Sequence, residues 1–219
     1  MLQRFERNKR GHDFAVGDLH GHFTLLLRKL RQIGFNPDAD RLFSVGDLID
    51  RGPDSMKCMG MMFEPWFWAV RGNHEEMMFD ALLRDGSIDL WLWNGGGWMA
   101  KENMEELKAL AQMLDKWLPC AIELESAAGH VGIVHAEVPG DDWAGVEAGD
   151  IKTMTWARRR VSERRCNPVR GIDAVICGHT PVSEPMRLGN VNYIDTGAFT
   201  TGHLTIIDLA DLCEVRAAA

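Results

Sequence analysis

The chain has 219 residues, of which 46% are hydrophobic and 8% aromatic, and this composition excludes a disordered polypeptide. Its 24 Lys and Arg residues against 32 Asp and Glu residues give a net charge of −8. That charge argues against stable nucleic-acid binding, because phosphate backbones need clustered cations. No apolar run approaches the roughly 18–20 residues of a membrane span, and the polar, basic residues 1–12 show no signal-peptide pattern.

Five cysteines are scattered along the chain, and none belongs to a C-x-x-C pair. They are Cys58, Cys120, Cys166, Cys177 and Cys213. An odd, scattered set is typical of neither a disulfide framework nor a zinc ribbon. We therefore expect reduced and mostly buried thiols in a cytoplasmic protein.

Short apolar runs bounded by Gly and Asp predict buried strands. In chain order these strands cover residues 14–16, 42–45, 67–70, 121–124, 131–134, 174–177, 191–194 and 204–207. Helical patterns cover residues 25–33, 56–63, 75–83, 101–117 and 155–165. Thr24 is expected to cap the first helix, and Asp54 or Ser55 the second.

Strands and helices alternate in the first half of the chain, and this order favours a mostly parallel sheet. The second half has more strands with fewer helices between them. Two packed sheets with helices outside fit that change better than one open sheet. Since no linker, low-complexity tract or repeat interrupts the pattern, we expect a single domain over residues 1–219.

Polar side chains follow five of the predicted strands, and glycine lies close to four of these positions. The side chains are Asp18, His20, Asp47, Asn73, His135 and His179. In α/β sheets, ligands bind beyond the carboxyl ends of the strands, on loops that the sheet holds in place. If the strands are neighbours, these six side chains therefore converge on one cleft.

The donor set of that cleft is informative. Three imidazoles, two carboxylates and one amide oxygen, without a thiolate, suit manganese, iron or zinc. Six ligands are too many for one ion that keeps a place for substrate, whereas two ions that share a carboxylate use them all. A single Asp or His after a strand is more often a turn or core residue. The combination is what indicates a metal site.

Three blocks resemble the signatures of the PPP-type serine/threonine protein phosphatases. They are Gly-Asp-Leu-His-Gly at 17–21, Gly-Asp-Leu-Ile-Asp-Arg-Gly at 46–52 and Arg-Gly-Asn-His-Glu at 71–75. His135 and Gly178-His179 match two later metal-binding histidines of that family. Within it, the chain most resembles the small phosphatase of bacteriophage lambda and its bacterial relatives, including at residues 92–98 and 193–197.

The resemblance implies an α/β, calcineurin-like metallophosphatase fold, with two packed mixed β-sheets flanked by helices and the metals at one end. It also implies two divalent metal ions, with manganese favoured and iron or zinc as alternatives. Asp18, His20 and Asp47 would hold the first ion. Asp47 would bridge to the second, which Asn73, His135 and His179 would complete.

The same resemblance implies catalytic roles. Arg51 and Arg158, together with Asn73, would bind the substrate phosphate, and planar guanidinium groups suit its oxygens. His74, oriented by Asp50, would protonate the leaving alkoxide. The implied reaction is direct in-line attack of a hydroxide shared by both metals. The partners would be phosphorylated proteins or peptides. The enzyme would be a monomer in the cytosol of a bacterium or of a phage-infected host.

Some positions depart from the family pattern or leave alternatives open. His22 is interpreted as an exposed neighbour of the site rather than a ligand, and Glu137 as a neutral replacement of Asp. Arg158 is chosen over Arg159 and Arg160 because Trp156 precedes it. Residues 95–97 are expected to form a turn near the mouth of the cleft. Three tryptophans, Trp91, Trp93 and Trp98, are expected to pack a helical segment.

Two enzyme functions compete, and a third class is weighed beside them. The first is a phosphatase for phosphoserine and phosphothreonine, with phosphotyrosine and phosphohistidine as further candidates. The second is a diadenosine tetraphosphate hydrolase, which would share the metal set. Relatives of that second kind typically lack the acid at Asp50 and often carry Asp at the position of Glu75, so both residues favour the phosphatase. An inactive binding module would have lost ligands, and none is missing.

Overall fold

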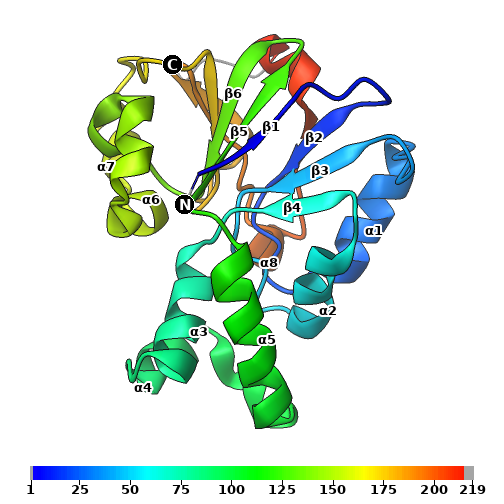
Figure 1. Ribbon diagram of the computed structural model, residues 1–219, viewed down its shortest axis with the longest axis vertical. Coiled ribbons are helices and arrows are strands. Elements are labelled where there is room, and N and C mark those ends of the chain that lie inside the picture. Colours follow the sequence, from blue (N-terminus) through cyan, green and yellow to red (C-terminus); the bar gives the residue numbers. More distant parts are fainter. Residues whose placement is uncertain (1, 215–219) are drawn as a thin grey trace.

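The computed structural model describes residues 2–214, and their strands form two packed sheets (Figure 1). The six-stranded sheet has the order β1 (Leu2–Phe5), β5 (Ala121–Ser126), β6 (Gly129–Val134), β7 (Ala174–Cys177), β9 (Val191–Tyr193), β8 (Met186–Leu188). The four-stranded sheet has the order β10 (Ile206–Asp208), β2 (Asp13–Val16), β3 (Arg41–Ser44), β4 (Phe67–Ala69). Each sheet contains parallel and antiparallel pairs, so both are mixed, as predicted.

Both faces of the central strands are buried, which explains their continuous apolar runs. In β3, Phe43 lies in the core between the sheets, while Leu42 belongs to a second core outside them. In β6, Ile133 lies in the same inner core, while Val134 belongs to a third core on the other side. Successive side chains of a strand point to opposite faces, so one short run serves two cores.

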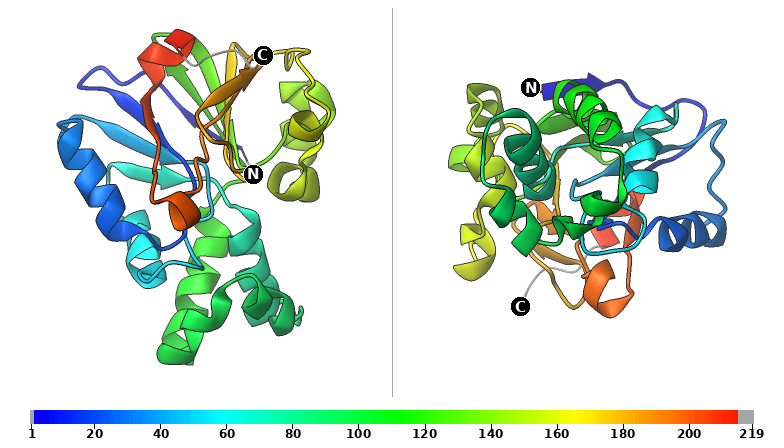
Figure 2. Two further views of the ribbon diagram at one scale, coloured as in Figure 1. Left: turned by 180° about the vertical axis from the view of Figure 1, so that it is seen from behind. Right: turned by 90° about the horizontal axis from the view of Figure 1, so that it is seen from below.

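Helices cover the outer face of each sheet. Figure 1 shows α1 (Phe23–Gln32) and α2 (Ser55–Gly60) beside the four-stranded sheet, and α6 (Ile151–Trp156) and α7 (Arg159–Ser162) beside the six-stranded sheet. Three further helices extend beyond one end of the sandwich (Figures 1 and 2): α3 (Asn73–Leu83), α4 (Ile88–Trp93) and α5 (Met104–Trp117). The short α8 (Ala198–Thr201) lies near this end. The predicted architecture is therefore confirmed.

Several predicted boundaries are wrong. The helix expected over 155–165 is two helices, because Ala157 between α6 and α7 is extended. Thr24 is not a cap, since α1 begins at Phe23. Asp54 occupies the N-cap position of α2 without a capping hydrogen bond, because its carboxylate pairs with Lys57 at 2.6 Å.

Two strands were missed altogether. β1 lies in a segment whose polar residues hide its pairing with β5, and β8 is only three residues long. Of the four cysteines with described side chains, Cys58, Cys120 and Cys177 are buried and Cys166 is exposed; the side chain of Cys213 lies outside the described residues.

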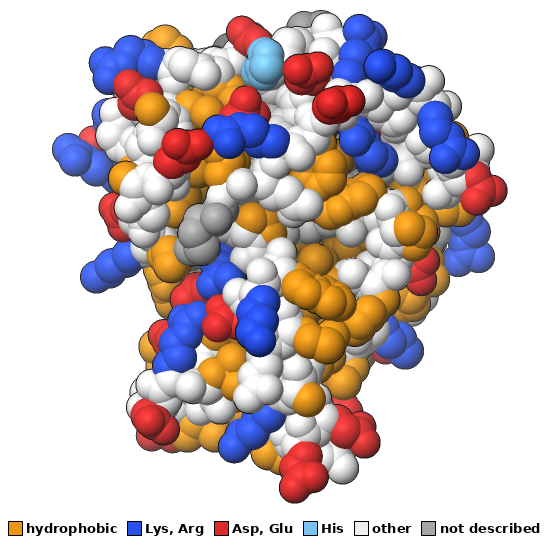
Figure 3. All heavy atoms as spheres, viewed as in Figure 1, with side chains coloured by type: hydrophobic (Ala, Val, Ile, Leu, Met, Phe, Trp, Pro, Cys, Tyr) orange, Lys and Arg blue, Asp and Glu red, His pale blue; other side chains and the backbone are white. Residues whose placement is uncertain are grey.

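The surface carries charges of both signs. On the face in Figure 3, Lys and Arg side chains are interspersed with Asp and Glu, and apolar side chains gather between them. None of the described helices has both the length and the apolar character that a membrane span requires.

Candidate active site

The carboxyl ends of β2, β3 and β4 in one sheet, and of β6 and β7 in the other, supply the predicted metal ligands. Asp47 lies at the centre. Its two carboxylate oxygens approach different imidazoles: Oδ2 is 3.6 Å from Nε2 of His20, and Oδ1 is 3.4 Å from Nε2 of His135. Asp47 belongs to both groups of side chains that are close enough to hold a metal ion, one with His20 and His74 and one with His135 and His179.

Backbone carbonyls fix which ring nitrogen of each histidine is free. Nδ1 of His20 contacts the oxygen of Ile49 at 3.0 Å, and Nδ1 of His135 contacts the oxygen of Val45 at 2.7 Å. Since a carbonyl only accepts, each Nδ1 carries the proton and each Nε2 keeps its lone pair. His179 uses Nε2 on the oxygen of Trp156, at 3.1 Å, which leaves Nδ1 free.

The imidazoles are also neutral, as metal ligands must be. Burial lowers the pKa of His20 to about 3 and that of His179 to about 3, and it lowers the pKa of His135 as well. Asn73 opens α3, and its Oδ1 lies 3.1 Å from Nε2 of His135. Three imidazoles and an amide oxygen therefore lie around Asp47, and Nε2 of His20 also accepts a hydrogen bond from Nη1 of Arg51.

Asp18 joins the site from the end of β2. Its carboxylate accepts the backbone N–H of His179 at 3.1 Å. A Cβ on Gly178 would overlap Oδ1 of Asp18, so only glycine permits this approach. Asp18 thus adjoins the other predicted metal ligands, although it belongs to neither candidate metal group.

Several buried carboxylates lie close together at the site, and their charges show whether cations would fit there. Burial, and then the charges of Asp195 and Asp47, raise the pKa of Asp18 well above its usual range. Burial and the charge of Asp47 raise the pKa of Asp195 to about 6. Buried carboxylates that repel one another take up a proton unless a positive charge compensates them. Divalent cations between neutral imidazoles and these carboxylates fit that requirement.

Strained backbone holds several of these groups. Left-handed φ values occur at non-glycine residues His20 (41°), Asp47 (50°), Asp50 (74°), Arg51 (69°) and His179 (64°). Such conformations cost about 1–3 kcal/mol each and persist only where the surroundings enforce them. Their concentration at one place supports a functional role for it.

A histidine and a carboxylate pair beside the predicted ligands. Nδ1 of His74 lies 2.6 Å from Oδ2 of Asp50, and Nε2 of His74 lies 3.9 Å from Oδ2 of Asp47. Burial opposes a charge on His74, but the carboxylates of Asp47 and Asp50 outweigh it and raise its pKa. His74 is therefore able to carry a proton at the edge of the site.

Two arginines, Arg51 and Arg158, lie beside the predicted metal ligands. Nη1 of Arg51 lies 2.8 Å from Nε2 of His20, and its guanidinium stacks 4.1 Å from the ring centre of Phe199. Arg158, at the break between α6 and α7, lies 3.4 Å from the oxygen of His179. The other two arginines are engaged elsewhere: Arg159 pairs with Glu163 at 2.9 Å, and the buried Arg160 pairs with Asp141 at 2.5 Å.

Glu75 is a buried carboxylate whose structural role the sequence did not reveal. It accepts the backbone N–H groups of Asp47, Leu48 and Gly72 at 2.8–2.9 Å, and so joins the loop after β3 to the start of α3. Burial and the charge of Asp47 raise the pKa of Glu75 to about 7.

Other partners of the site were missed as well. Asp195 had a detectable signal, because it follows the apolar run 191–194 as the other ligands follow theirs. Phe199 meets the ring of His20 edge to face, with ring centres 5.0 Å apart, and no sequence signal indicated this contact. Trp91 and Trp98 point their indole nitrogens at Asp50, at distances of 2.7–3.1 Å, and sequence periodicity does not encode such contacts.

Of the remaining predictions around the site, some are confirmed and others are wrong. His22 is half-buried rather than exposed, with Nδ1 2.8 Å from the oxygen of His20, and it belongs to neither candidate metal group. Glu137 accepts the backbone N–H of Arg160. Gly95 lies in a turn beside Arg51, as predicted, but Gly96 and Gly97 begin a short 3-10 helix, Gly96–Lys101. Trp93 was expected to pack a helical segment, but it is 91% exposed because it lies on the outer side of α4.

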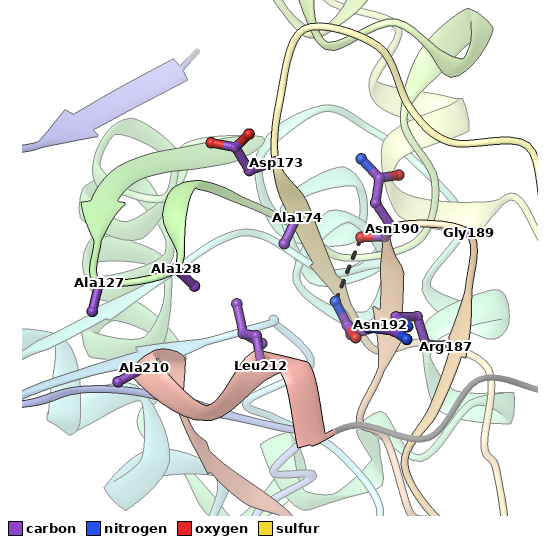
Figure 4. A pocket seen from close by; sticks show the side chains of 10 residues that line it. All are labelled: Ala127, Ala128, Asp173, Ala174, Arg187, Gly189, Asn190, Asn192, Ala210 and Leu212. Atoms are coloured by element: carbon purple, nitrogen blue, oxygen red, sulfur yellow. Dashed lines mark hydrogen bonds between the residues drawn. The ribbon is translucent and has the colours of Figure 1, made fainter.

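A cavity of about 430 Å³ lies at the other ends of β6 and β7 (Figure 4). It is lined by Asp173, Arg187 and Asn192 among others, and by none of the predicted site residues. A second cavity, of about 410 Å³, begins at Arg51 and is lined by Met56, Trp98 and Lys101 among others. Of these two cavities, the second is the one that adjoins the site.

Comparison with known proteins identifies the family of the chain. Residues 14–183 match the family model described as calcineurin-like phosphoesterase. The chain is 40% identical to serine/threonine-protein phosphatase 1 of Salmonella typhimurium over 94% of this chain and 95% of that protein. It is 34% identical to serine/threonine-protein phosphatase 2 of Escherichia coli over 93% and 95%.

Relatives named for a different substrate also occur. The asymmetrical bis(5'-nucleosyl)-tetraphosphatase PrpE of Anoxybacillus flavithermus is 27% identical over 88% of each chain. A crystal structure assigned provisionally to a diadenosine tetraphosphatase superposes with a TM-score of 0.70 at 20% identity, covering 97% of this chain and 95% of that one. At that identity, the likeness shows the fold alone. The chain belongs to the calcineurin-like phosphoesterase family and is a phosphatase of the hydrolase class.

Proposed function

We propose that this chain is a phosphoprotein phosphatase that hydrolyses phosphoserine and phosphothreonine monoesters, with phosphotyrosine and phosphohistidine as further substrates. The observation that carries the proposal is the buried His74–Asp50 pair, 2.6 Å apart, beside the ligand cluster. A serine alkoxide is a poor leaving group and needs a proton donor, and a histidine held by a carboxylate is a suitable one.

The proposed metal ligands are the six side chains around Asp47. Asp18, His20 and Asp47 would hold one divalent ion, and Asp47, Asn73, His135 and His179 a second; manganese is proposed, with iron or zinc as alternatives. When bound, such ions neutralise charge on the phosphoryl group and lower the pKa of water at the site.

The other roles belong to side chains that border the cluster. Arg51 and Arg158, with Asn73, would bind and orient the phosphate oxygens, because both guanidinium groups are exposed over the site. His74 would donate its Nε2 proton to the leaving oxygen. The 410 Å³ cavity beside Arg51 gives room for the peptide around the phosphorylated residue. We propose that one domain, as a monomer, carries this whole reaction.

The relatives named serine/threonine-protein phosphatase at 34–40% identity support this substrate class. The relative named for a dinucleotide tetraphosphate, at 27% identity, keeps a second candidate function open, hydrolysis of diadenosine tetraphosphate. Both functions would use the same metal ligands. They differ in the part of the substrate that carries the phosphate, which is a peptide in one case and a dinucleotide in the other.

Kinetics with the manganese-loaded protein test the proposal. We expect kcat/KM for a phosphoserine peptide to exceed that for diadenosine tetraphosphate by about tenfold or more, a difference of about 1.4 kcal/mol in transition-state binding. A preference for the dinucleotide would replace the proposed function with the second candidate.

A further inference from the structure

The carboxylate of Asp50 has more partners than His74. It is fully buried, and it lies 3.0 and 3.1 Å from the indole nitrogen of Trp91 through its two oxygens. The indole nitrogen of Trp98 donates to Oδ1 at 2.7 Å. Two tryptophans therefore contact the carboxylate that faces the proposed general acid.

These partners select one chemical form of Asp50. An indole N–H only donates, so it stabilises an ionised carboxylate and has no use for a carboxylic acid proton. Burial raises the pKa of Asp50, and the N–H groups of His74, Trp98 and Trp91 act in the opposite direction. Trp98 donates to Oδ1 alone and Trp91 to both oxygens, so the indoles fix the orientation of the carboxylate whose Oδ2 accepts the Nδ1 proton of His74.

The two indoles are themselves held in place. Trp91 is buried at the end of α4, and its ring meets that of Trp98 edge to face, with centres 5.9 Å apart and an interplanar angle of 86°. A Cβ on Gly96 would lie 2.7 Å from the ring of Trp91, so a larger residue there would displace the indole. The segment between α4 and α5 is thus shaped around these rings.

We infer that Trp91 and Trp98 are positioning residues of the general acid, whose indole N–H groups hold the Asp50 carboxylate so that it orients His74. The inference rests on the proposed function for its catalytic consequence. Neither tryptophan is expected to touch the reacting atoms, so the effect passes through Asp50. A side chain that orients a proton donor matters most where the leaving group needs the proton.

The test replaces each indole by a ring without an N–H group, in Trp98→Phe and Trp91→Phe. We expect kcat on a phosphoserine peptide to fall about 10- to 100-fold in each variant, with KM changed less than about threefold. On an aryl phosphate, whose leaving group needs little protonation, the loss should stay below about threefold. Trp93→Phe, an exposed site on the same segment, is the matched control and should match the parent protein on both substrates.

Two kinetic outcomes would overturn the inference. Equal losses on the peptide and the aryl phosphate would show that the indoles only support the fold, and unchanged kinetics on the peptide would show that they do not position the acid. Thermal melting of each variant identifies any that fails to fold. Since Trp91 is fully buried and Trp98 only partly, Trp98→Phe is expected to remain folded.

A spectroscopic measurement keeps the inference separate from the choice of substrate. In the parent protein, the Nδ1 proton of His74 should give a downfield NMR signal protected from exchange, because it is held against Asp50. In Trp98→Phe and Trp91→Phe that signal should shift upfield and broaden. If it stays unchanged in both variants, the inference is wrong, whatever the protein hydrolyses. If it changes while the parent prefers the dinucleotide, only the proposed substrate class is wrong.

Discussion

At the scale of single residues, His74 combines a buried carboxylate partner with a free Nε2 at the edge of the site. Replacing it by Asn keeps a polar side chain but removes the transferable proton. We expect His74→Asn to lower kcat on a phosphoserine peptide by several hundred-fold, within the roughly 10²–10⁴-fold range of general acids. An aryl phosphate should lose far less, and steady-state kinetics with both substrates measures the difference.

One result for His74→Asn would contradict the role of His74 as a general acid. If both substrates lose equally, His74 contributes to binding or to metal retention rather than to protonation of the leaving group. Metal analysis of the purified variant separates these roles, because His74 also lies within reach of a metal that His20 and Asp47 would hold. An unchanged metal content with unequal losses would agree with the acid role alone.

At the scale of elements, the break between α6 and α7 carries Arg158 toward the site. Asp141 anchors the following segment, because its carboxylate accepts hydrogen bonds from Arg160, Arg165 and Asn167. Arg160 is buried and also donates to the backbone oxygens of its own loop. One carboxylate thus fixes the part of the chain that orients Arg158.

Asp141 predicts a pH dependence of stability. Burial opposes its ionisation, but hydrogen bonds from Asn167 and Arg160 outweigh that effect and lower its pKa from 3.8. A lowered folded-state pKa means that the carboxylate stabilises the fold fully above the ordinary value and that this stability is lost as the pH falls through the folded-state pKa. We expect Asp141→Asn to lower the free energy of unfolding at neutral pH by about 1–3 kcal/mol.

Urea unfolding of parent and variant checks this prediction. The difference between them should be constant from pH about 7 to about 5 and should shrink below pH about 4. Asp142→Asn is the matched control, since Asp142 pairs with Arg170 on the surface and should contribute little. If the difference in unfolding free energy between parent and Asp141→Asn grows as the pH falls, the pKa of Asp141 is not lowered in the folded state.

At the scale of the whole molecule, both sheets contribute to one site, and much of this could be predicted from the sequence. Each strand end carries its polar residues in the sequence itself, so Asp18, Asp47 and His179 could be assigned to one edge from strand ends alone. Burial gives apolar runs that indicate strands such as β4 and β9 although these are three residues long, whereas the less buried β8 gives no such run. The order of elements then left few ways to arrange the sheets.

The rest depends on contacts that no periodic pattern records. The indole contacts to Asp50 join residues 41 and 48 positions apart. Phe199 reaches His20 and Arg51 from the far end of the chain. The extended backbone at Ala157 interrupts a segment whose composition favours a helix throughout, because Arg158 and Arg160 turn to opposite environments there. Such features follow from tertiary packing rather than from local propensity.

The crowded carboxylates make a prediction for the molecule as a whole. Asp18, Asp47, Asp195 and Glu75 are all buried within one region, and burial and neighbouring charges raise the pKa of Asp18, Asp195 and Glu75, so we expect bound cations to stabilise the folded chain. Ions that bind only the folded chain stabilise it by about 2.7 kcal/mol at a hundredfold excess over Kd. For a chain of this size, that corresponds to a rise in Tm of about 5–10 °C.

Thermal melting with and without a chelator measures this effect. We expect chelation to abolish phosphatase activity and lower Tm, and added manganese to restore both in a concentration-dependent way. Asp47→Asn should lose most of the manganese-dependent rise, because its carboxylate belongs to both candidate metal groups. Activity that survives exhaustive chelation, or a full manganese response in Asp47→Asn, would refute the assignment of Asp47 as the bridge between two ions.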